Sequence, residues 1–156
     1  RKAGFEICRQ FECYHLSAEL SSGPAPAGLK IKRSVVPDMS LYLPMQNTDA
    51  SFIDSNQHLV HHLDHEVVLE AELDGQLVGY IIYQRDSGRI SQIGVHPGFR
   101  RKAIGTQLLR EAQNLSVQKK LSILNIERHQ DVISAFLKRN CFTIMIEQYE
   151  MVRDLV

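Results

Sequence analysis

The stretch Val95-His96-Pro97-Gly98-Phe99-Arg100-Arg101-Lys102-Ala103-Ile104-Gly105 decides the fold of this chain. It follows an apolar run, Ile90 to Val95, that is typical of a β-strand, and it opens a helix-like run, Thr106 to Asn114. The first N–H groups of a helix have no partners inside the helix and carry the positive end of its dipole. Three consecutive cations strengthen that field, and small residues at 103 and 105 let a phosphate approach the main chain. The stretch therefore predicts a site that binds a pyrophosphate.

Composition limits the classes of function. The chain has 156 residues, the size of one domain, and its 44% hydrophobic content is enough for a core. It contains no run of about 18 apolar residues and no secretory leader, so we expect a cytoplasmic protein without a membrane partner. The formal charge is zero at pH 7, so we expect no nucleic-acid partner. The three cysteines do not have the spacing of metal ligands, and we expect them to be reduced thiols in a cytoplasmic protein rather than disulfides: Cys8, Cys13 and Cys141.

The beginning of the chain resembles its end. Lys2 to Ile7 reads like Arg139 to Ile144, and a second similarity, of residues 10–13 to 148–151, follows with one residue of slippage. Phe5 and Phe142 are separated by a domain length, which suggests a tandem duplication. Chance similarity of two short strands is the alternative.

The first residue is Arg rather than Met, and we therefore expect a fragment of a tandem protein. Residues 1–20 would be the terminal strand of an upstream domain, 21–28 a linker rich in Ser, Gly and Pro, and 29–156 the second domain. Alone, residues 5–16 would expose unpaired edges and apolar side chains. We expect them to pair with a sheet edge, either within this domain or across a dimer.

The remaining chain alternates strand-like and helix-like segments. Strands are expected at residues 29–33, 67–73, 76–85, 90–95, 121–126 and 142–152, with a hairpin turn at Asp74-Gly75. Helices are expected at residues 38–46, 56–65, 131–139 and from about 104 onward. Antiparallel hairpins come first and a crossover connection comes later. This order predicts a protein of mixed α/β class, of the α+β type with a largely antiparallel sheet.

With these elements in order, residues 29–152 resemble the GNAT superfamily of acetyl-CoA-dependent N-acetyltransferases. The turn of that family has Arg or Gln, two variable residues, Gly, one variable residue, then Gly or Ala. Here it reads Arg100-Arg101-Lys102-Ala103-Ile104-Gly105, after Val95-His96-Pro97. The resemblance implies the acyl-CoA N-acyltransferase fold, a mostly antiparallel mixed sheet with helices on both faces. It also implies acetyl-CoA as the cosubstrate and no metal.

The resemblance further implies which residues hold the cofactor. Main-chain groups of Ile93, Gly94 and Val95 would pair with the pantetheine arm like an added strand. That strand would bulge and splay from residues 121–126 to admit the arm. Gln130 stands where Asn is usual and keeps the amide. The pyrophosphate would bind the main chain of the turn and one hydroxyl, from Arg100, Arg101, Lys102, Ala103, Ile104, Gly105 and Thr106.

Departures from the family pattern affect the expected chemistry. Leu137 stands where Tyr is usual, and Leu has no proton for the leaving thiolate. Cys141 and Ala103 replace usual glycines, and Ala disfavours a positive φ. Residues 89–94 lack the carboxylate often found on this strand. The candidates for acid or base, each with an ordinary surface position as the alternative, are Glu70, Glu72 and Tyr149.

Four histidines precede the first long hairpin. His58, His61, His62 and His65 have helical spacing, but no carboxylate or thiolate completes a metal shell, so we expect no metal. In the family this segment shapes the acceptor pocket, which implies that His65 and Glu66 contact the substrate.

The sequence thus predicts an acyltransferase that moves an acetyl group from acetyl-CoA to a primary amine of a small molecule, by direct attack in a ternary complex. An acyl-enzyme is disfavoured because Cys141 has no evident base beside it. One alternative is a catalytically weak CoA-binding or regulatory module of a tandem GNAT protein, which Leu137 favours. Another is acetylation of protein lysines or N-termini. The expected partners are the amine and either an upstream GNAT domain or a second chain.

Overall fold

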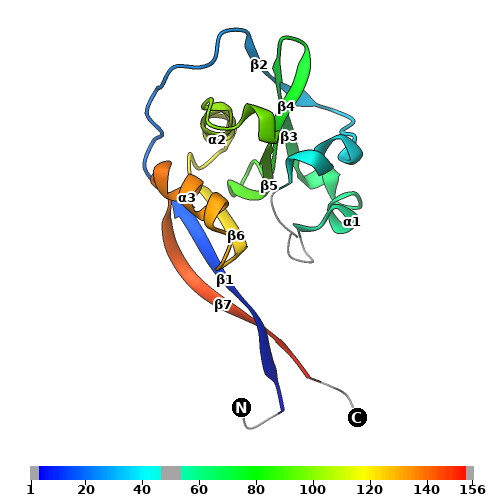
Figure 1. The fold of residues 1–156 in the computed structure, drawn as a ribbon, viewed down its shortest axis with the longest axis vertical. Helices are drawn as coiled ribbons and strands as arrows, with labels where there is room; N and C mark the ends of the chain where they lie inside the picture. Colours follow the sequence, from blue (N-terminus) through cyan, green and yellow to red (C-terminus); the bar gives the residue numbers. More distant parts are fainter. Residues whose placement is uncertain (1–3, 47–53, 154–156) are drawn as a thin grey trace.

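A computed structural model describes residues 4–46 and 54–153. One seven-stranded sheet organises them, in the order β2-β3-β4-β5-β6-β1-β7 (Figure 1). Neighbouring strands are antiparallel except β5 and β6, which are parallel, as a mostly antiparallel mixed sheet requires. The strands are β1 (Glu6–Leu16), β2 (Leu29–Ser34), β3 (Val67–Leu73), β4 (Gln76–Tyr83), β5 (Arg89–Val95), β6 (Leu121–Glu127) and β7 (Thr143–Val152).

Helices cover both faces of this sheet (Figure 1). Leu69 and Ile81 belong to the buried cluster that includes residues of α2 and α3, while their neighbours Val68 and Ile82 belong to the cluster that includes residues of η1 and α1. This alternation follows from the two-residue period of a strand and explains why the central strands read as continuous apolar runs. The helices are η1 (Met39–Met45), α1 (Asn56–Leu59), η3 (Leu63–His65), η4 (Pro97–Phe99), α2 (Ile104–Leu115) and α3 (Asp131–Arg139).

Helices α2 and α3 lie where the apolar periodicity predicts, whereas two other expected helices are shorter. Residues 38–46 form the 3-10 helix η1, which contains Pro44, a residue without an N–H for an α-helical bond. The expected helix 56–65 breaks at His62, which leaves the helical region at φ −130° and ψ 13°. No helix among residues 4–46 and 54–153 has the length and apolarity to cross a membrane.

Strand β1 is an interior strand of the sheet. It pairs antiparallel with β6 on one side and β7 on the other, and Cys13, Tyr14 and Leu16 are at most 2% exposed. The expectation that residues 5–16 pair with a sheet is confirmed, and the pairing is within the chain. They lie between two strands rather than at an edge. Beyond β6, β1 and β7 continue away from the body as a two-stranded ribbon (Figure 1).

Residues 17–28, which include the expected linker 21–28, lie along α2 as a strap. The Gln113 amide donates to Ala18 O at 2.8 Å and accepts from Leu20 N at 2.9 Å. One turn earlier, Arg110 donates to Ser21 O at 2.6 Å. Side chains of α2 therefore satisfy backbone groups of the strap and tie β1 to the rest of the chain.

Candidate functional site

The basic turn joins β5 to α2 as the sequence predicts. Arg101 and Ala103 adopt left-handed conformations, with φ of 65° and 61°. Ala103 is the N-cap of α2 and has no side-chain capping bond. Within the described residues, the backbone N–H groups from Arg101 to Thr106 donate to no acceptor; the first that does is Gln107, to Ala103 O at 3.0 Å. A row of unpaired donors at the positive end of a helix favours an anion.

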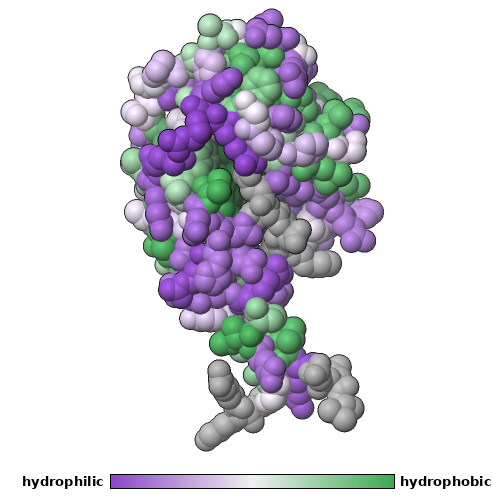
Figure 2. All heavy atoms as spheres, in the orientation of Figure 1, coloured by the Kyte–Doolittle hydropathy of each residue, from purple (hydrophilic) through white to green (hydrophobic). Residues whose placement is uncertain are grey.

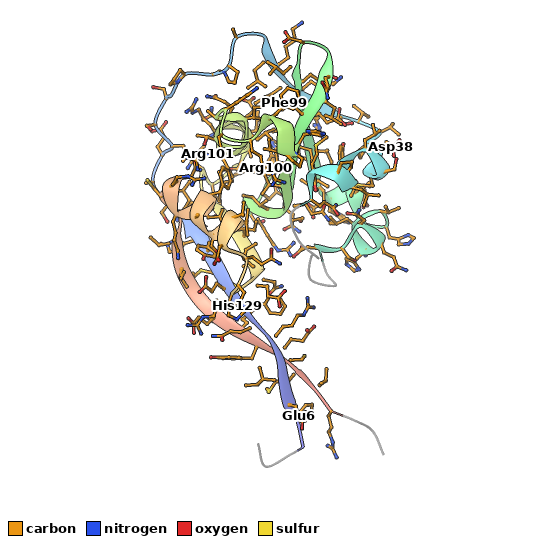
Figure 3. The ribbon with its side chains drawn as sticks, in the orientation of Figure 1. Glu6, Asp38, Phe99, Arg100, Arg101 and His129 are labelled. Carbon is orange, nitrogen blue, oxygen red and sulfur yellow. The ribbon has the colours of Figure 1, made fainter. Side chains whose placement is uncertain are left out.

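The three cations of the turn have different surroundings. Arg100 donates through Nε to Val95 O at 3.1 Å and so holds the turn against the end of β5. The Lys102 ammonium lies 5.1 Å from the centroid of the Phe99 ring. Arg101 lines the cleft described next and a neighbouring hollow. Figure 3 shows Phe99, Arg100 and Arg101 together beside α2 and α3.

A cleft lies between β5, the turn and α3. It opens because β5 and β6 pair only at Arg89–Ser122 and Ile90–Ile123 and separate beyond that point. Strand β5 also bulges where Gln92 pairs with Ile82 and Ile90 with Tyr83. The bulge and the splay implied by the family resemblance are therefore present. The lining residues are Ile93, Gly94, Val95, Phe99, Arg100, Arg101, Ile104, Gly105, Val132, Ile133, Phe136 and Arg139.

The cleft gathers most of the expected cofactor residues. Two more, Ala103 and Thr106, line the neighbouring hollow together with Arg101 and Arg139. Lys102 and Gln130 belong to the lining of neither space. Figure 2 shows a hollow on this face with an apolar wall and a hydrophilic rim.

Gly105 lines the cleft and also packs against α3. A Cβ atom there would lie 2.9 Å from the Phe136 ring, so the glycine makes room for a side chain of α3. Phe136 can thus reach α2 and form one wall of the cleft.

Phe136 lines the cleft together with other α3 residues, and Leu137 does not. Leu137, in the position where the family usually has Tyr, is fully buried in the core. Neither side chain carries a transferable proton. The wall formed by α3 is therefore aromatic and without an acid.

Glu66 lies just before β3, with its carboxylate directed toward the bulge of β5. Its Oε1 accepts from Ser91 Oγ at 3.0 Å and from Gln84 Nε2 at 3.4 Å. Its Oε2 is buried and has no partner among the described residues. Burial raises the pKa of the Glu66 carboxyl above its ordinary value, against the lowering effect of its hydrogen bonds. A shielded carboxylate with one unused oxygen is suited to accept a proton.

Next to Ser91, Gln92 organises a buried polar network. Its Oε1 accepts from Tyr80 OH at 3.0 Å, and its Nε2 donates to Asn56 Oδ1 at 2.9 Å and to Asp54 O at 2.6 Å. Burial raises the pKa of Tyr80 to about 12, so the phenol stays neutral and donates. Sequence reasoning did not select Ser91 or Gln92. The signal was available, because they are two adjacent polar residues between the apolar residues Ile90 and Ile93.

The other acid and base candidates have structural partners. Glu70 accepts from Tyr42 OH at 2.6 Å, beneath η1, and Glu72 forms an ion pair with Lys32. Tyr149 is half-exposed on the β1–β7 ribbon, where Gln10 donates to its hydroxyl at 3.4 Å. None of the three lines the cleft.

The histidine segment does not converge on one point. His58 and His62 have ring centroids 4.5 Å apart, and His65 is exposed and contacts Asp64 at 3.3 Å. Within the described part of the chain, no three potential metal-ligating side chains form a group. Of the two expected substrate residues, Glu66 contacts β5 through Ser91, whereas the side chain of His65 faces solvent.

Comparison with known proteins agrees with this geometry. Residues 33–140, more than half of the chain, match the model described as the Acetyltransferase (GNAT) family. No curated protein gives a significant match.

Solved structures show the same fold at low identity. The chain is similar to a functionally unknown conserved protein from Staphylococcus epidermidis, with a TM-score of 0.70 and 19% identity over all of this chain and 65% of that one. It is similar to a GCN5-related N-acetyltransferase from Kribbella flavida, with a TM-score of 0.64 and 14% identity over 96% of this chain and 60% of that one. It is also similar to AAC(6')-Iy in complex with a CoA-containing bisubstrate analog, with a TM-score of 0.55 and 16% identity over 82% of this chain and 97% of that one. The chain thus spans less than two thirds of the first two structures.

Proposed function

The chain belongs to the Acetyltransferase (GNAT) family, and from this premise we propose that it transfers an acetyl group from acetyl-CoA to a primary amine of a small molecule. The transfer is a direct attack within a ternary complex. The observation that carries the proposal is the cleft between β5 and α3, which ends at the uncapped N-terminus of α2.

The residues of the cleft fit acetyl-CoA. From Ile93 to Val95, β5 pairs with β4 on one side and has no paired residue on the β6 side, so its outward main-chain groups suit the amides of a pantetheine arm. Phe136 and Val132 offer an apolar wall. The unpaired N–H groups from Arg101 to Thr106 suit a pyrophosphate, with Arg101 as the counter-charge. Bound there, acetyl-CoA supplies the activated acetyl group.

In this proposal Glu66 accepts the proton of the attacking amine. An amine attacks only in its neutral form, and at neutral pH most primary amines carry a proton. Ser91 holds Oε1 and leaves Oε2 for that proton. Neither Glu66 nor Ser91 lines the cleft. Ser91 lies two residues before Ile93, roughly 7 Å along the strand, so in this proposal the proton reaches the carboxylate through water. The raised pKa of Glu66 makes it a stronger base than an exposed carboxylate.

The leaving thiolate takes its proton from water in this proposal, because Phe136 and Leu137 have none to give. The same absence favours the second candidate function, a CoA-binding module with weak catalysis. A cationic small molecule is the preferred acceptor because Glu66 and the polar groups around Gln92 lie together on the η1 and α1 side of the sheet.

The test combines calorimetric titration of acetyl-CoA with thiol release measured over a panel of primary amines. We expect binding near micromolar Kd, about −8 kcal/mol. Arg101→Glu should weaken binding at least tenfold, whereas Lys120→Glu, an exposed charge reversal outside the cleft, should leave it unchanged. Glu66→Gln should bind acetyl-CoA normally and turn over on the order of 10² to 10⁴ times more slowly.

The outcomes separate the candidates. Normal binding with no acetylation of any amine would favour the module. Full activity in Glu66→Gln would remove Glu66 from the mechanism while leaving the transferase. Absence of acetyl-CoA binding by the unaltered chain would overturn both functions.

A further inference from the structure

Strand β7 forms one edge of the sheet, no other described strand pairs with its outer edge, and nine of its ten residues are exposed. An edge strand of this length with apolar side chains favours pairing with another strand. Figure 2 shows apolar surface on the ribbon next to the termini. The large apolar residues of β7, exposed by 43–54%, are Ile144, Met145, Ile146, Tyr149, Met151 and Val152.

The β1–β7 register has an internal two-fold symmetry. Its centre is the pair Phe11–Gln148, and a half-turn about that pair exchanges each β1 residue with the β7 residue 137 positions later. The half-turn places each of the nine pairs onto another observed pair, or onto itself at the centre. The pair Ile7–Met151, for example, is placed onto Ile144–Tyr14. The same separation relates Phe5 to Phe142, the two aromatic residues of the sequence repeat.

The two β-bulges of the ribbon are also related by this two-fold symmetry. The register shifts in β1 at Cys8, between Ile7 and Arg9, and in β7 at Met145, opposite Cys13 and Tyr14. Cys8 and Met145 are themselves 137 positions apart. Any antiparallel pair has local two-fold axes, but matching bulges are not required by the pairing. The repeat detected in the sequence is therefore also a repeat of backbone geometry.

Burial breaks this symmetry. Phe142 is 2% exposed and its equivalent Phe5 is 44% exposed; Tyr14 is fully buried and its equivalent Met151 is 54% exposed. The half of the ribbon near β6 is covered by the core. The other half, with Glu6 near its tip (Figure 3), keeps apolar residues at some of the equivalent positions and has no cover among the described residues: Phe5, Ile7 and Met151 are 44–56% exposed. The equivalents of Cys13 and Leu16 are instead the charged residues Glu150 and Arg153.

We propose that a second domain of the same fold covers the outer half of the ribbon, related to this domain by the two-fold axis at Phe11–Gln148. A strand of that domain equivalent to β6 pairs with the outer edge of β7, as β6 pairs with β1 here. Each domain thereby contributes a terminal strand to the interior of the joined sheet.

The symmetry also says where the second domain lies in the polypeptide. Strand β7 follows α3 after a short turn, and β1 is the equivalent of β7. Strand β1 is therefore the last strand of the second domain, which precedes it in the same chain. A second copy of residues 1–156 does not fit, because its β6 is already paired with its own β1.

The test compares the full-length polypeptide with residues 1–156 alone. In the full-length protein, amide exchange in a peptide covering 148–153 should be at least tenfold slower than in the shorter chain, while a peptide from β4 exchanges equally in both. Equal exchange at 148–153 would overturn the proposal. So would a full-length polypeptide without a second domain of this fold before β1, or protection that appears only as the protein dimerises.

Two methionine variants give a matched control. Met151→Lys should lower the Tm of the full-length protein by several degrees and barely change that of residues 1–156. Met145 has the same 54% exposure as Met151. Its symmetry equivalent, Cys8, is exposed, so this domain does not cover Cys8 and the second domain should not cover Met145. Met145→Lys should therefore change neither Tm. An equal effect of Met151→Lys in both proteins, or equal effects of the two variants in the full-length protein, would contradict the proposed interface.

Discussion

At the scale of single residues, Glu66 combines a chemical advantage with a loss of stability. Burial raises its pKa, so the folded chain binds a proton at pH values where the unfolded chain has released it. Stability therefore falls as the pH rises from the ordinary value of 4.5 through the raised pKa, and the loss persists above it. Groups suited to catalysis often have this property.

We therefore expect Glu66→Gln to have a higher Tm than the unaltered chain at pH 7, with a difference that shrinks toward pH 4. The amide keeps an oxygen for Ser91 and carries no charge to desolvate. Thermal unfolding across this pH range measures the effect, with Glu19→Gln at an exposed position as control. A lower Tm of Glu66→Gln at every pH would contradict the inference that the buried charge of Glu66 lowers the stability of the folded chain.

Ala103 provides a second residue-scale prediction. Its φ of 61° costs a non-glycine residue roughly 1–2 kcal/mol in the folded chain. Glycine avoids that cost but loses more conformational entropy on folding, which offsets about 0.5–1 kcal/mol of the gain. Ala103→Gly should raise the free energy of unfolding by up to about 1 kcal/mol. Ala135→Gly, at an exposed site within α3, should lower it by about 1 kcal/mol. Urea denaturation distinguishes the two, and a loss in both would show that the turn tolerates Ala without strain.

At the scale of elements, the strap depends on one face of α2. Gln113 is 2% exposed and serves three backbone groups, at Ala18, Leu20 and Lys119. Its removal leaves buried polar atoms unpaired. The strap thus connects β1 to β2 without being an independent segment.

We expect Gln113→Ala to destabilise the chain by roughly 1–3 kcal/mol and to speed proteolysis within residues 17–28. Asn114→Ala, at the exposed neighbouring position, is the control and should do neither. Limited proteolysis followed by mass spectrometry locates the cuts, and denaturation measures stability. Unchanged cleavage in Gln113→Ala would show that the strap is held by its other contacts.

At the scale of the whole molecule, β1 completes the sheet on which the site depends. It separates β6 from β7 and contributes Phe11, Tyr14 and Leu16 to the buried interior. A chain that begins at residue 17 should therefore lose cooperative unfolding, whereas one that begins at Gly4 should retain it. Circular dichroism with thermal unfolding measures this. A sharp transition in the shorter chain would mean that β7 can take the place of β1 beside β6.

The sequence by itself determined the strand, turn and helix around residues 95–105, the bounds of α3 and the succession of strands along the chain from residue 29 onward. These features depend on local rules: apolar period, helix-end geometry and turn dipeptides act within a few residues. They were enough to recognise the family turn, and the family resemblance then implied Ile93, Gly94 and Val95, which line the cleft.

Only the tertiary structure decided which residues meet across the chain. Glu66 reaches Ser91, 25 positions away, and β1 reaches β7, at least 128 positions away. The choice of Phe136 over Leu137 as the cleft wall is a rotation of about 100° on one helix, which periodicity alone does not resolve when both residues are apolar. Such contacts are set by how the sheet closes and where each helix packs. That is a property of the assembled core rather than of any one segment.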